Sequence, residues 1–257
     1  TPNSALQEPP VTQPENPSPS APWQDLQAVF AQALQYQESG RRAEAEALYL
    51  ELSRALPENP VVALNLGNLY LEAGHVDAAE AQFQRALRSD PKQPLVWYNL
   101  GRLHQQQGDF QAAEEAYLQA LAYQPHLAQA HNSLGVLWQA QQRWDEAQAA
   151  YHRALALQPG LLSAQNNLGT VLLELGHLPA AEQCFRQVLA QAPDFQEAWL
   201  NLAQSLRSQG QAHASLAATQ TALGLGGRST ALALLQALTL PPIYADEADI
   251  LAWRAHF

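Results

Sequence analysis

The feature that most constrains this chain is a short pattern, Leu-Gly preceded by a polar residue, that returns every 34 residues. Its glycines are Gly67, Gly101, Gly135 and Gly169, and a weaker copy carries Ala203 at the same position. A fixed period of this length is the signature of stacked repeats. Because each repeat contacts only its neighbours, the length of 257 residues does not translate into a number of globular domains.

The positions inside the repeat predict a pair of helices. When each repeat is numbered from the place of Pro60, positions 4, 7, 8 and 11 share one face of a first helix, and small and aromatic residues recur at helical spacing in a second. Glycine at position 8 costs about 1 kcal/mol relative to alanine inside a helix, so we expect the second helix to pack closely against the missing side chain. At position 15 a further glycine ends the first helix in a left-handed turn, and Gln142 replaces it once at a small local cost. These glycines are Gly40, Gly74, Gly108, Gly176 and Gly210.

The pattern of a large residue, Leu-Gly, an aromatic residue, small alanines and a closing proline resembles the tetratricopeptide repeat (TPR). The resemblance implies an all-α solenoid of about six helix-turn-helix repeats, wound into a right-handed superhelix with a concave inner surface and a C-terminal capping helix. The aromatic residues at position 24 are Phe83, Tyr117, Tyr151 and Phe185. Within residues 23–229 the expected repeats are 26–59, 60–93, 94–127, 128–161, 162–195 and 196–229.

The two ends of the chain do not follow the period. Residues 1–22 contain seven prolines and no apolar periodicity, which predicts a disordered leader that acts as a spacer or, alternatively, as a proline-motif ligand. Residues 230–257 predict a capping helix and the start of a linker to a missing C-terminal domain. A chain that starts with threonine and contains no methionine indicates that part of the native protein is missing. The apolar residues of the tail offer a surface for a homodimer. They are Ile250, Leu251, Trp253 and Phe257.

Composition excludes several classes of function. The formal net charge of −11 argues against a nucleic-acid partner, and no apolar run is long enough to span a membrane. A single cysteine, Cys184, fits a packing role in a reducing compartment such as the cytoplasm.

His104 and His131 occupy packing positions, and the sequence has no catalytic, metal-binding or phosphate-binding motif. We therefore expect no cofactor and no catalytic site within this chain.

Position 6 of the first helix carries the most informative polar residues. An amide has two donors and an acceptor oxygen, so a column of asparagines can hold the N–H and C=O groups of an extended peptide backbone. In a TPR array this column lines the concave groove, although each asparagine alone could also cap or cover a solvent-facing helix. No lysine stands four residues before the column, which disfavours a clamp for a terminal carboxylate. The candidate peptide-binding residues are Asn65, Asn99, Asn167 and Asn201 of the column, with Asn68, Arg102 and Asn132 beside it.

A TPR array with such a ladder resembles the N-terminal domain of O-linked N-acetylglucosamine transferases. The segment from Leu240 to Phe257 is similar to the connection between repeats and catalytic domain in bacterial SPINDLY-type relatives. The resemblance implies that the repeats bind protein substrates, while a separate C-terminal domain transfers sugar from a nucleotide donor to serine or threonine. Ser133 departs from the ladder. The alternative is a freestanding TPR scaffold or assembly factor with no attached enzyme.

Overall fold

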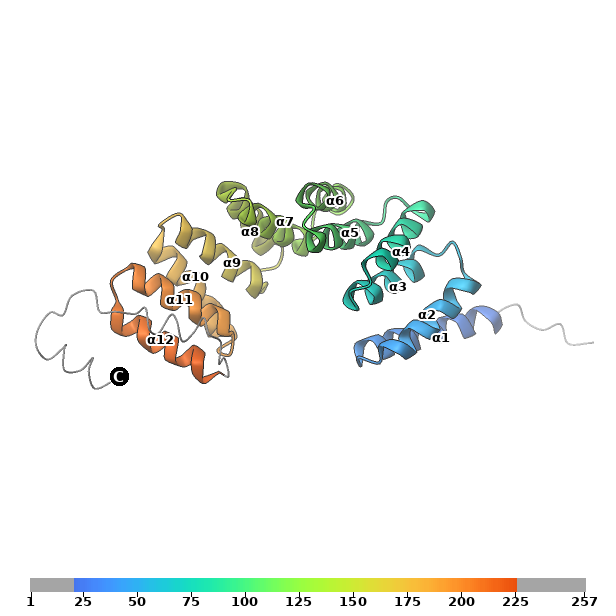
Figure 1. Ribbon diagram of the computed structural model, residues 1–257, viewed down its shortest axis with the longest axis horizontal. Helices are drawn as coiled ribbons and strands as arrows, with labels where there is room; N and C mark the ends of the chain where they lie inside the picture. The colour runs from blue at the N-terminus through green and yellow to red at the C-terminus, as the bar shows by residue number, and fades with distance from the viewer. Residues whose placement is uncertain (1–20, 226–257) are drawn as a thin grey trace, which may run out of the picture. The chain divides into compact units, whose positions relative to one another are not determined.

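The computed structural model describes residues 21–225, and this part of the chain folds into twelve α-helices with no strand (Figure 1). The helices belong to two compact units, residues 1–89 and 90–257. In the N-terminal unit they are α1 (Ala21–Glu38), α2 (Arg42–Ala55), α3 (Pro60–Glu72) and α4 (Val76–Ser89). In the C-terminal unit they are α5 (Pro94–Gln107), α6 (Phe110–Tyr123), α7 (Ala128–Ala140), α8 (Trp144–Leu157), α9 (Leu162–Glu174), α10 (Leu178–Gln191), α11 (Gln196–Ser208) and α12 (Ala212–Gly224).

The twelve helices of the described residues form six successive pairs, so the all-α, helix-turn-helix architecture is confirmed. Helix α1 starts at Ala21 and therefore takes in the last two residues that the sequence assigned to the leader. Pro22 is tolerated there because the first turn of a helix does not need its N–H group. The rest of the leader, the predicted capping helix and the predicted dimer surface lie outside the described residues.

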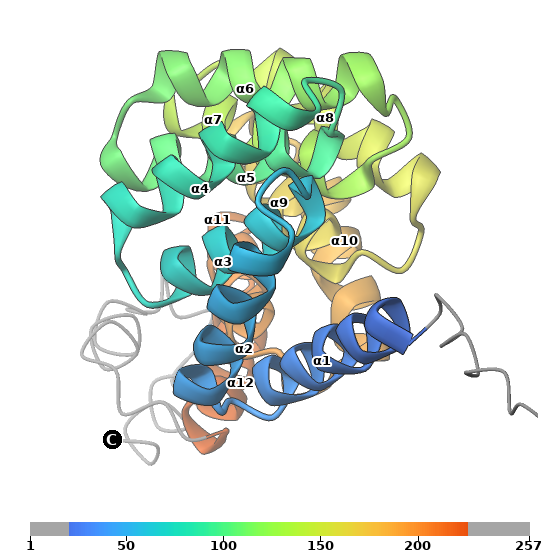
Figure 2. The same cartoon turned by 90° about the vertical axis from the view of Figure 1, so that its right-hand side faces the viewer.

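Packing inside the C-terminal unit follows one rule. Each second helix contacts the first helix of its own repeat and the first helix of the next one, as α6 does with α5 and α7. Figures 1 and 2 both show α6 lying over α5. The first helices also contact one another directly, α5 with α7, α7 with α9 and α9 with α11. The first helices of this unit therefore form a continuous layer.

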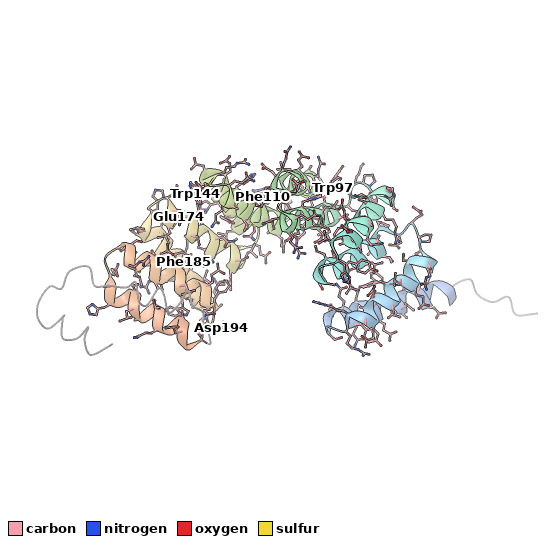
Figure 3. The ribbon with its side chains drawn as sticks, in the orientation of Figure 1. Trp97, Phe110, Trp144, Glu174, Phe185 and Asp194 are labelled. Carbon is pink, nitrogen blue, oxygen red and sulfur yellow. The ribbon has the colours of Figure 1, made fainter. Side chains whose placement is uncertain are left out.

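The glycines at position 8 are the points where the two helices of a repeat come closest. A Cβ atom on Gly135 would lie 2.5 Å from Cε1 of Tyr151, a distance that no real side chain tolerates. The other three inner repeats show the same contact, and all four rings are fully buried. Phe185, one of these rings, is labelled in Figure 3. The expected close packing is thus confirmed. The other pairs are Gly67 with Phe83, Gly101 with Tyr117, and Gly169 with Phe185.

A buried ring that carries a hydroxyl group has a dedicated acceptor at position 12. The hydroxyl of Tyr117 donates to Oε1 of Gln105 at 2.8 Å, and burial raises its pKa. Where the ring is phenylalanine, position 12 is leucine, as in Leu71 and Leu173. The rule follows from the cost of burying a hydroxyl without a partner. The other tyrosines bonded in this way are Tyr49 to Gln37 at 3.0 Å and Tyr151 to Gln139 at 2.8 Å.

The turns between paired helices adopt the expected left-handed backbone. The five glycines at position 15 have φ values between 74° and 79°. Gln142 has φ 59° and is the only residue other than glycine with positive φ among the described residues.

Replacing Gln142 by glycine is therefore expected to stabilise the protein. A left-handed conformation costs an L-residue about 1–2 kcal/mol, and the greater freedom of glycine in the unfolded chain returns about 0.5–1 kcal/mol of this. We expect Gln142→Gly to raise the free energy of unfolding by about 0.5–1 kcal/mol, measured by urea denaturation. The reverse change, Gly176→Gln, meets no neighbouring atom within 4 Å and should destabilise by a similar amount. A Gln142→Gly variant that is less stable than the parent would contradict this account.

The tyrosine–glutamine pair can be tested by converting one repeat to the phenylalanine–leucine type. Tyr117→Phe leaves the acceptor of Gln105 unpaired and should cost about 1 kcal/mol, whereas the double variant Tyr117→Phe/Gln105→Leu should recover most of that loss. Because folding raises the pKa of Tyr117, the unfolded chain loses this proton first. The stabilisation is therefore complete below pH 10 and falls as the pH rises further. Unfolding curves between pH 9 and 11 should show a weaker alkaline loss in the double variant, and an equal loss would refute the assignment.

Candidate functional site

Four asparagines of the first-helix layer in the C-terminal unit form two hydrogen-bonded pairs that meet on α9, and we name these pairs the amide ladder. Nδ2 of Asn167 on α9 donates to Oδ1 of Asn132 on α7 at 3.4 Å. Nδ2 of Asn201 on α11 donates to Oδ1 of Asn166 on α9 at 3.1 Å. Each bond joins position 6 of one repeat to position 5 of the preceding repeat, 35 residues earlier. The ladder therefore links three consecutive first helices.

Two further side chains extend the ladder at α9 and α11. Asn201 also donates to Oγ1 of Thr170 at 3.4 Å, and Nδ2 of Asn166 donates to Oε1 of Glu197 at 3.1 Å. Asn166 is only 1% exposed, whereas Asn201 is half-buried and Glu197 is exposed. The ladder thus runs from a buried amide to groups that solvent or a ligand can reach.

Asn99 and Arg102 form a separate pair on α5. Asn99 is 6% exposed, and its Oδ1 accepts a hydrogen bond from Nη1 of Arg102 at 3.1 Å. Ser133 on α7 stands at position 6 where the ladder would continue, but position 5 of the preceding repeat is Tyr98 rather than asparagine. The side chains at these two positions explain why the amide pairing starts only at Asn132.

Asn65 and Asn68 belong to the N-terminal unit. Nδ2 of Asn65 donates to the carbonyl oxygen of Val61 in its own helix at 2.8 Å. Oδ1 of Asn68 is buried and has no hydrogen-bond partner among the described residues. Of the candidates named from the sequence, the structure thus pairs Asn132 with Asn167 and places Asn201 against Asn166, the residue next to Asn167.

Three members of this group were missed by the sequence analysis, namely Asn166, Thr170 and Glu197. A signal for the first was present, because the doublet Asn166-Asn167 precedes Asn201 by the same 35 residues that separate Asn132 from Asn167. A comparison of equal positions in successive repeats does not show this pairing. The actual pairing joins unequal positions.

Other polar and apolar features of the described residues have structural roles. His131 is half-buried, its Nε2 lies 3.1 Å from the carbonyl oxygen of Pro125, and burial lowers its pKa. Trp97 and Trp199 use their indole N–H at the same repeat position to donate to the carbonyl oxygens of Pro91 and Pro193. The histidine therefore replaces a tryptophan in a contact between repeats.

Cys184 also has a packing role. Its side chain is 7% exposed and lies in an apolar cluster of the C-terminal unit, and burial raises the pKa of its thiol. No group of three or more His, Cys, Asp or Glu residues within 21–225 could hold a metal ion. In the same range, no helix is both long and apolar enough to cross a bilayer.

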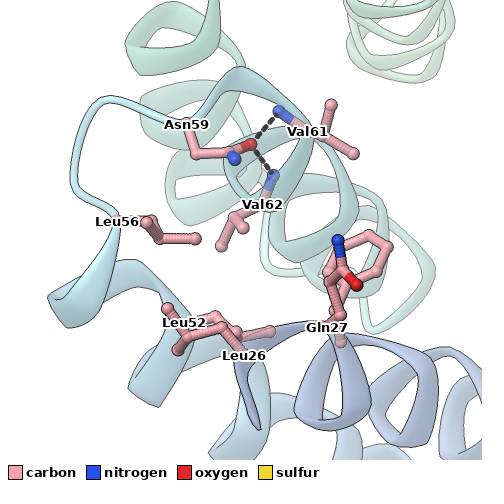
Figure 4. A pocket seen from close by; sticks show the side chains of 8 residues that line it. Leu26, Gln27, Leu52, Leu56, Asn59, Val61 and Val62 are labelled. Carbon is pink, nitrogen blue, oxygen red and sulfur yellow. Dashed lines mark hydrogen bonds between the residues drawn. The ribbon is translucent and has the colours of Figure 1, made fainter. Parts of the chain in front are cut away.

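An apolar pocket of about 370 Å³ lies in the N-terminal unit between α1 and the start of α3 (Figure 4). Its main polar residue, Asn59, caps α3, since its Oδ1 accepts from the backbone N–H groups of Val61 and Val62 at 2.9 and 3.2 Å. This oxygen is therefore already occupied. The lining residues are Leu26, Gln27, Phe30, Leu52, Leu56, Asn59, Val61 and Val62.

The amide ladder should be measurable as an energetic coupling. Asn166→Ala leaves Glu197 and Asn201 without their buried partner and should lower the free energy of unfolding by about 1–3 kcal/mol. Asn201→Ala should cost less, and the double variant should cost less than the sum, with a coupling of about 0.5–1.5 kcal/mol. Asn132→Ala combined with Asn201→Ala is the control, because these residues share no hydrogen bond and should be additive. Additive effects for the first pair would show that the ladder bond contributes nothing.

Comparison with known proteins identifies the repeat. Four models of the tetratricopeptide repeat match residues 36–103, 94–127, 126–194 and 166–229. A search of curated proteins found no match.

Solved structures share the fold at low sequence identity. A chain of the APC/C hetero-tetramer Cut9-Hcn1 matches with a TM-score of 0.76 and 18% identity over 84% of this chain and 43% of that chain, so this chain spans less than half of it. Pseudomonas aeruginosa pilF matches with a TM-score of 0.64 and 22% identity over 77% of this chain and 97% of its own. YrrB, described as a TPR protein with an unusual peptide-binding site, has a TM-score of 0.59 and 20% identity over 72% of this chain and 95% of its own. The helix pairs and the glycines at positions 8 and 15 agree with the matching family models. This chain therefore carries an array of tetratricopeptide repeats from residue 36 to residue 229, as shown by these models.

Proposed function

We propose that the first-helix layer of the C-terminal unit binds an extended peptide segment of a client protein. The repeat array is a protein-interaction fold, and the observation that supports this particular face is the amide ladder. Asn132, Asn167 and Asn201 present half-buried amides on three consecutive first helices, α7, α9 and α11. Packed helices lie about 8–10 Å apart, which is the length of about three residues of an extended chain. An extended peptide that crosses the layer would therefore meet an amide at regular intervals.

The ladder bonds leave each amide able to bind a ligand. A primary amide has two N–H donors and an oxygen with two lone pairs, and the bond between Asn167 and Asn132 uses one donor of the first and one lone pair of the second. The same bond fixes the side-chain rotamers before a ligand arrives, which reduces the entropy lost on binding. Because amides bind the peptide backbone, this face would hold segments of varied sequence.

The resemblance to O-linked N-acetylglucosamine transferases supports a more specific proposal, in which the array is the substrate-recognition part of a bacterial, cytoplasmic glycosyltransferase. Its supports are the asparagine column and residues 240–257, which lie outside the described part of the chain. A freestanding scaffold or assembly factor is the alternative, and it would use the same binding face. The mass of the native product, detected with an antibody against the repeats, separates the two. A product larger than 28.1 kDa by the size of a catalytic domain favours the enzyme, and a product near that mass favours the scaffold.

Peptide binding can be tested with a displayed library of random dodecamers, followed by fluorescence anisotropy on the selected peptides. The double variant Asn132→Ala/Asn167→Ala removes two backbone contacts worth about 1 kcal/mol each and should weaken binding about tenfold or more. Gln183→Ala is the matched control, because Gln183 is an exposed amide on the second helix α10. Thermal melts of both variants establish that the helices remain folded. Equal affinity of the parent and the double variant would place the peptide elsewhere and overturn the proposal.

A further inference from the structure

The face that carries Asn167 and Asn201 of the amide ladder has charges of opposite sign at its two ends. Positions 2, 6, 9 and 13 of the first helices define this stripe, and in the C-terminal unit only three of its residues are charged. Arg102 lies on α5, Glu174 on α9 and Glu197 on α11, while the stripe on α7 has no charge. Figure 3 labels Glu174 on its helix. The stripe is therefore positive at α5, neutral at α7 and negative at α9 and α11.

A buried asparagine holds the charged group at each end. Asn99 is 6% exposed and accepts from Nη1 of Arg102 at 3.1 Å, and Asn166 is 1% exposed and donates to Oε1 of Glu197 at 3.1 Å. Burying an amide is costly unless it is hydrogen-bonded. These two amides are bonded to groups that reach the surface, so both charges are positioned by the interior of the protein.

Neither positioned charge is used in an ion pair among the described residues. The ion pairs within 21–225 join Arg41 to Glu44, Arg186 to Glu182, and Arg143 to both Glu114 and Glu146. Arg207 on α11 stands at position 12, where Gln105 and Gln139 bind the second helix of their own repeat, and so lies off the stripe. The charged groups of Arg102 and Glu197 are therefore available to pair with charged groups of a ligand.

We propose that the layer selects extended segments with an acidic side chain at the end over α5, a basic side chain at the end over α9 and α11, and an uncharged stretch between them. This inference rests on the proposed peptide binding and adds the chemical class of the peptide. Three helix-to-helix steps of about 8–10 Å separate α5 from α11, and an extended chain advances about 3.3 Å per residue. The two charges should therefore stand about seven to nine residues apart. The amides would hold the backbone, and the charges would fix the register and the direction.

The test uses one uncharged dodecamer from the library selection as a parent peptide. From it we derive six peptides: aspartate near the N-terminus with lysine near the C-terminus, the reverse arrangement, two aspartates, two lysines, and the tighter mixed peptide with either its aspartate alone or its lysine alone. Anisotropy should show that one of the two mixed peptides binds about threefold to fivefold more tightly than the parent, as expected for exposed ion pairs. The two-aspartate and two-lysine peptides should gain less. The gain should shrink between 50 mM and 500 mM salt because exposed pairs are screened.

Variants of the chain then assign each charge. In Glu197→Gln the preference for the mixed peptide over a peptide with aspartate alone should disappear, and in Arg102→Gln the preference over a peptide with lysine alone should disappear. Gln183→Ala should keep both preferences. If the parent and all charged peptides bind equally, charge selection is refuted while peptide binding stands. If no dodecamer binds at all, the proposed function itself fails.

Discussion

The contact between a glycine and an aromatic ring inside each inner repeat sets the geometry on which the rest of the array depends. With no Cβ at Gly135, the ring of Tyr151 approaches the backbone of the first helix, and the other inner repeats repeat this contact. The outer repeats relax it in different ways. Ala33 and Tyr49 stand at these positions in the first repeat, and Ala203 with the smaller Thr219 in the last. An array can vary at its ends because only one side of an outer repeat must match a neighbour.

The short helix separation allows a polar network inside a largely apolar structure. A buried tyrosine is compatible with this packing because Gln105, in the last turn of α5, lies within reach of its hydroxyl. Ladder bonds connect neighbouring first helices to one another. The same amides that we propose for ligand binding therefore also hold repeats together, and any ligand would bind groups that are already oriented.

The fold could be predicted from the sequence because its determinants are local and periodic. The helix pairs, the close packing at position 8 and the left-handed turns all follow from residues compared at one position of successive repeats, and the exception at Gln142 was visible in the same way. The ladder was only half predicted. Its bonds join position 6 to position 5 of the preceding repeat, as in Asn167 with Asn132, and that offset depends on how neighbouring helices are rotated and shifted. The burial of Asn99 likewise depends on neighbouring side chains rather than on its own column.

The tyrosine–glutamine pairs and the asparagine pairs of the ladder respond differently when a repeat is duplicated, inserted or lost. A tyrosine and its glutamine lie 12 residues apart within one repeat, so duplication of a repeat copies both partners together. Asparagines of the ladder lie 35 residues apart in adjacent repeats, so loss or insertion of a unit separates them. Because the tyrosine–glutamine pairs lie within one repeat, they allow repeats to be exchanged. The asparagine pairs lie between repeats and therefore fix their order. The three repeats that begin within residues 128–208 therefore have a fixed order, although each of them is built from the same kind of helix pair.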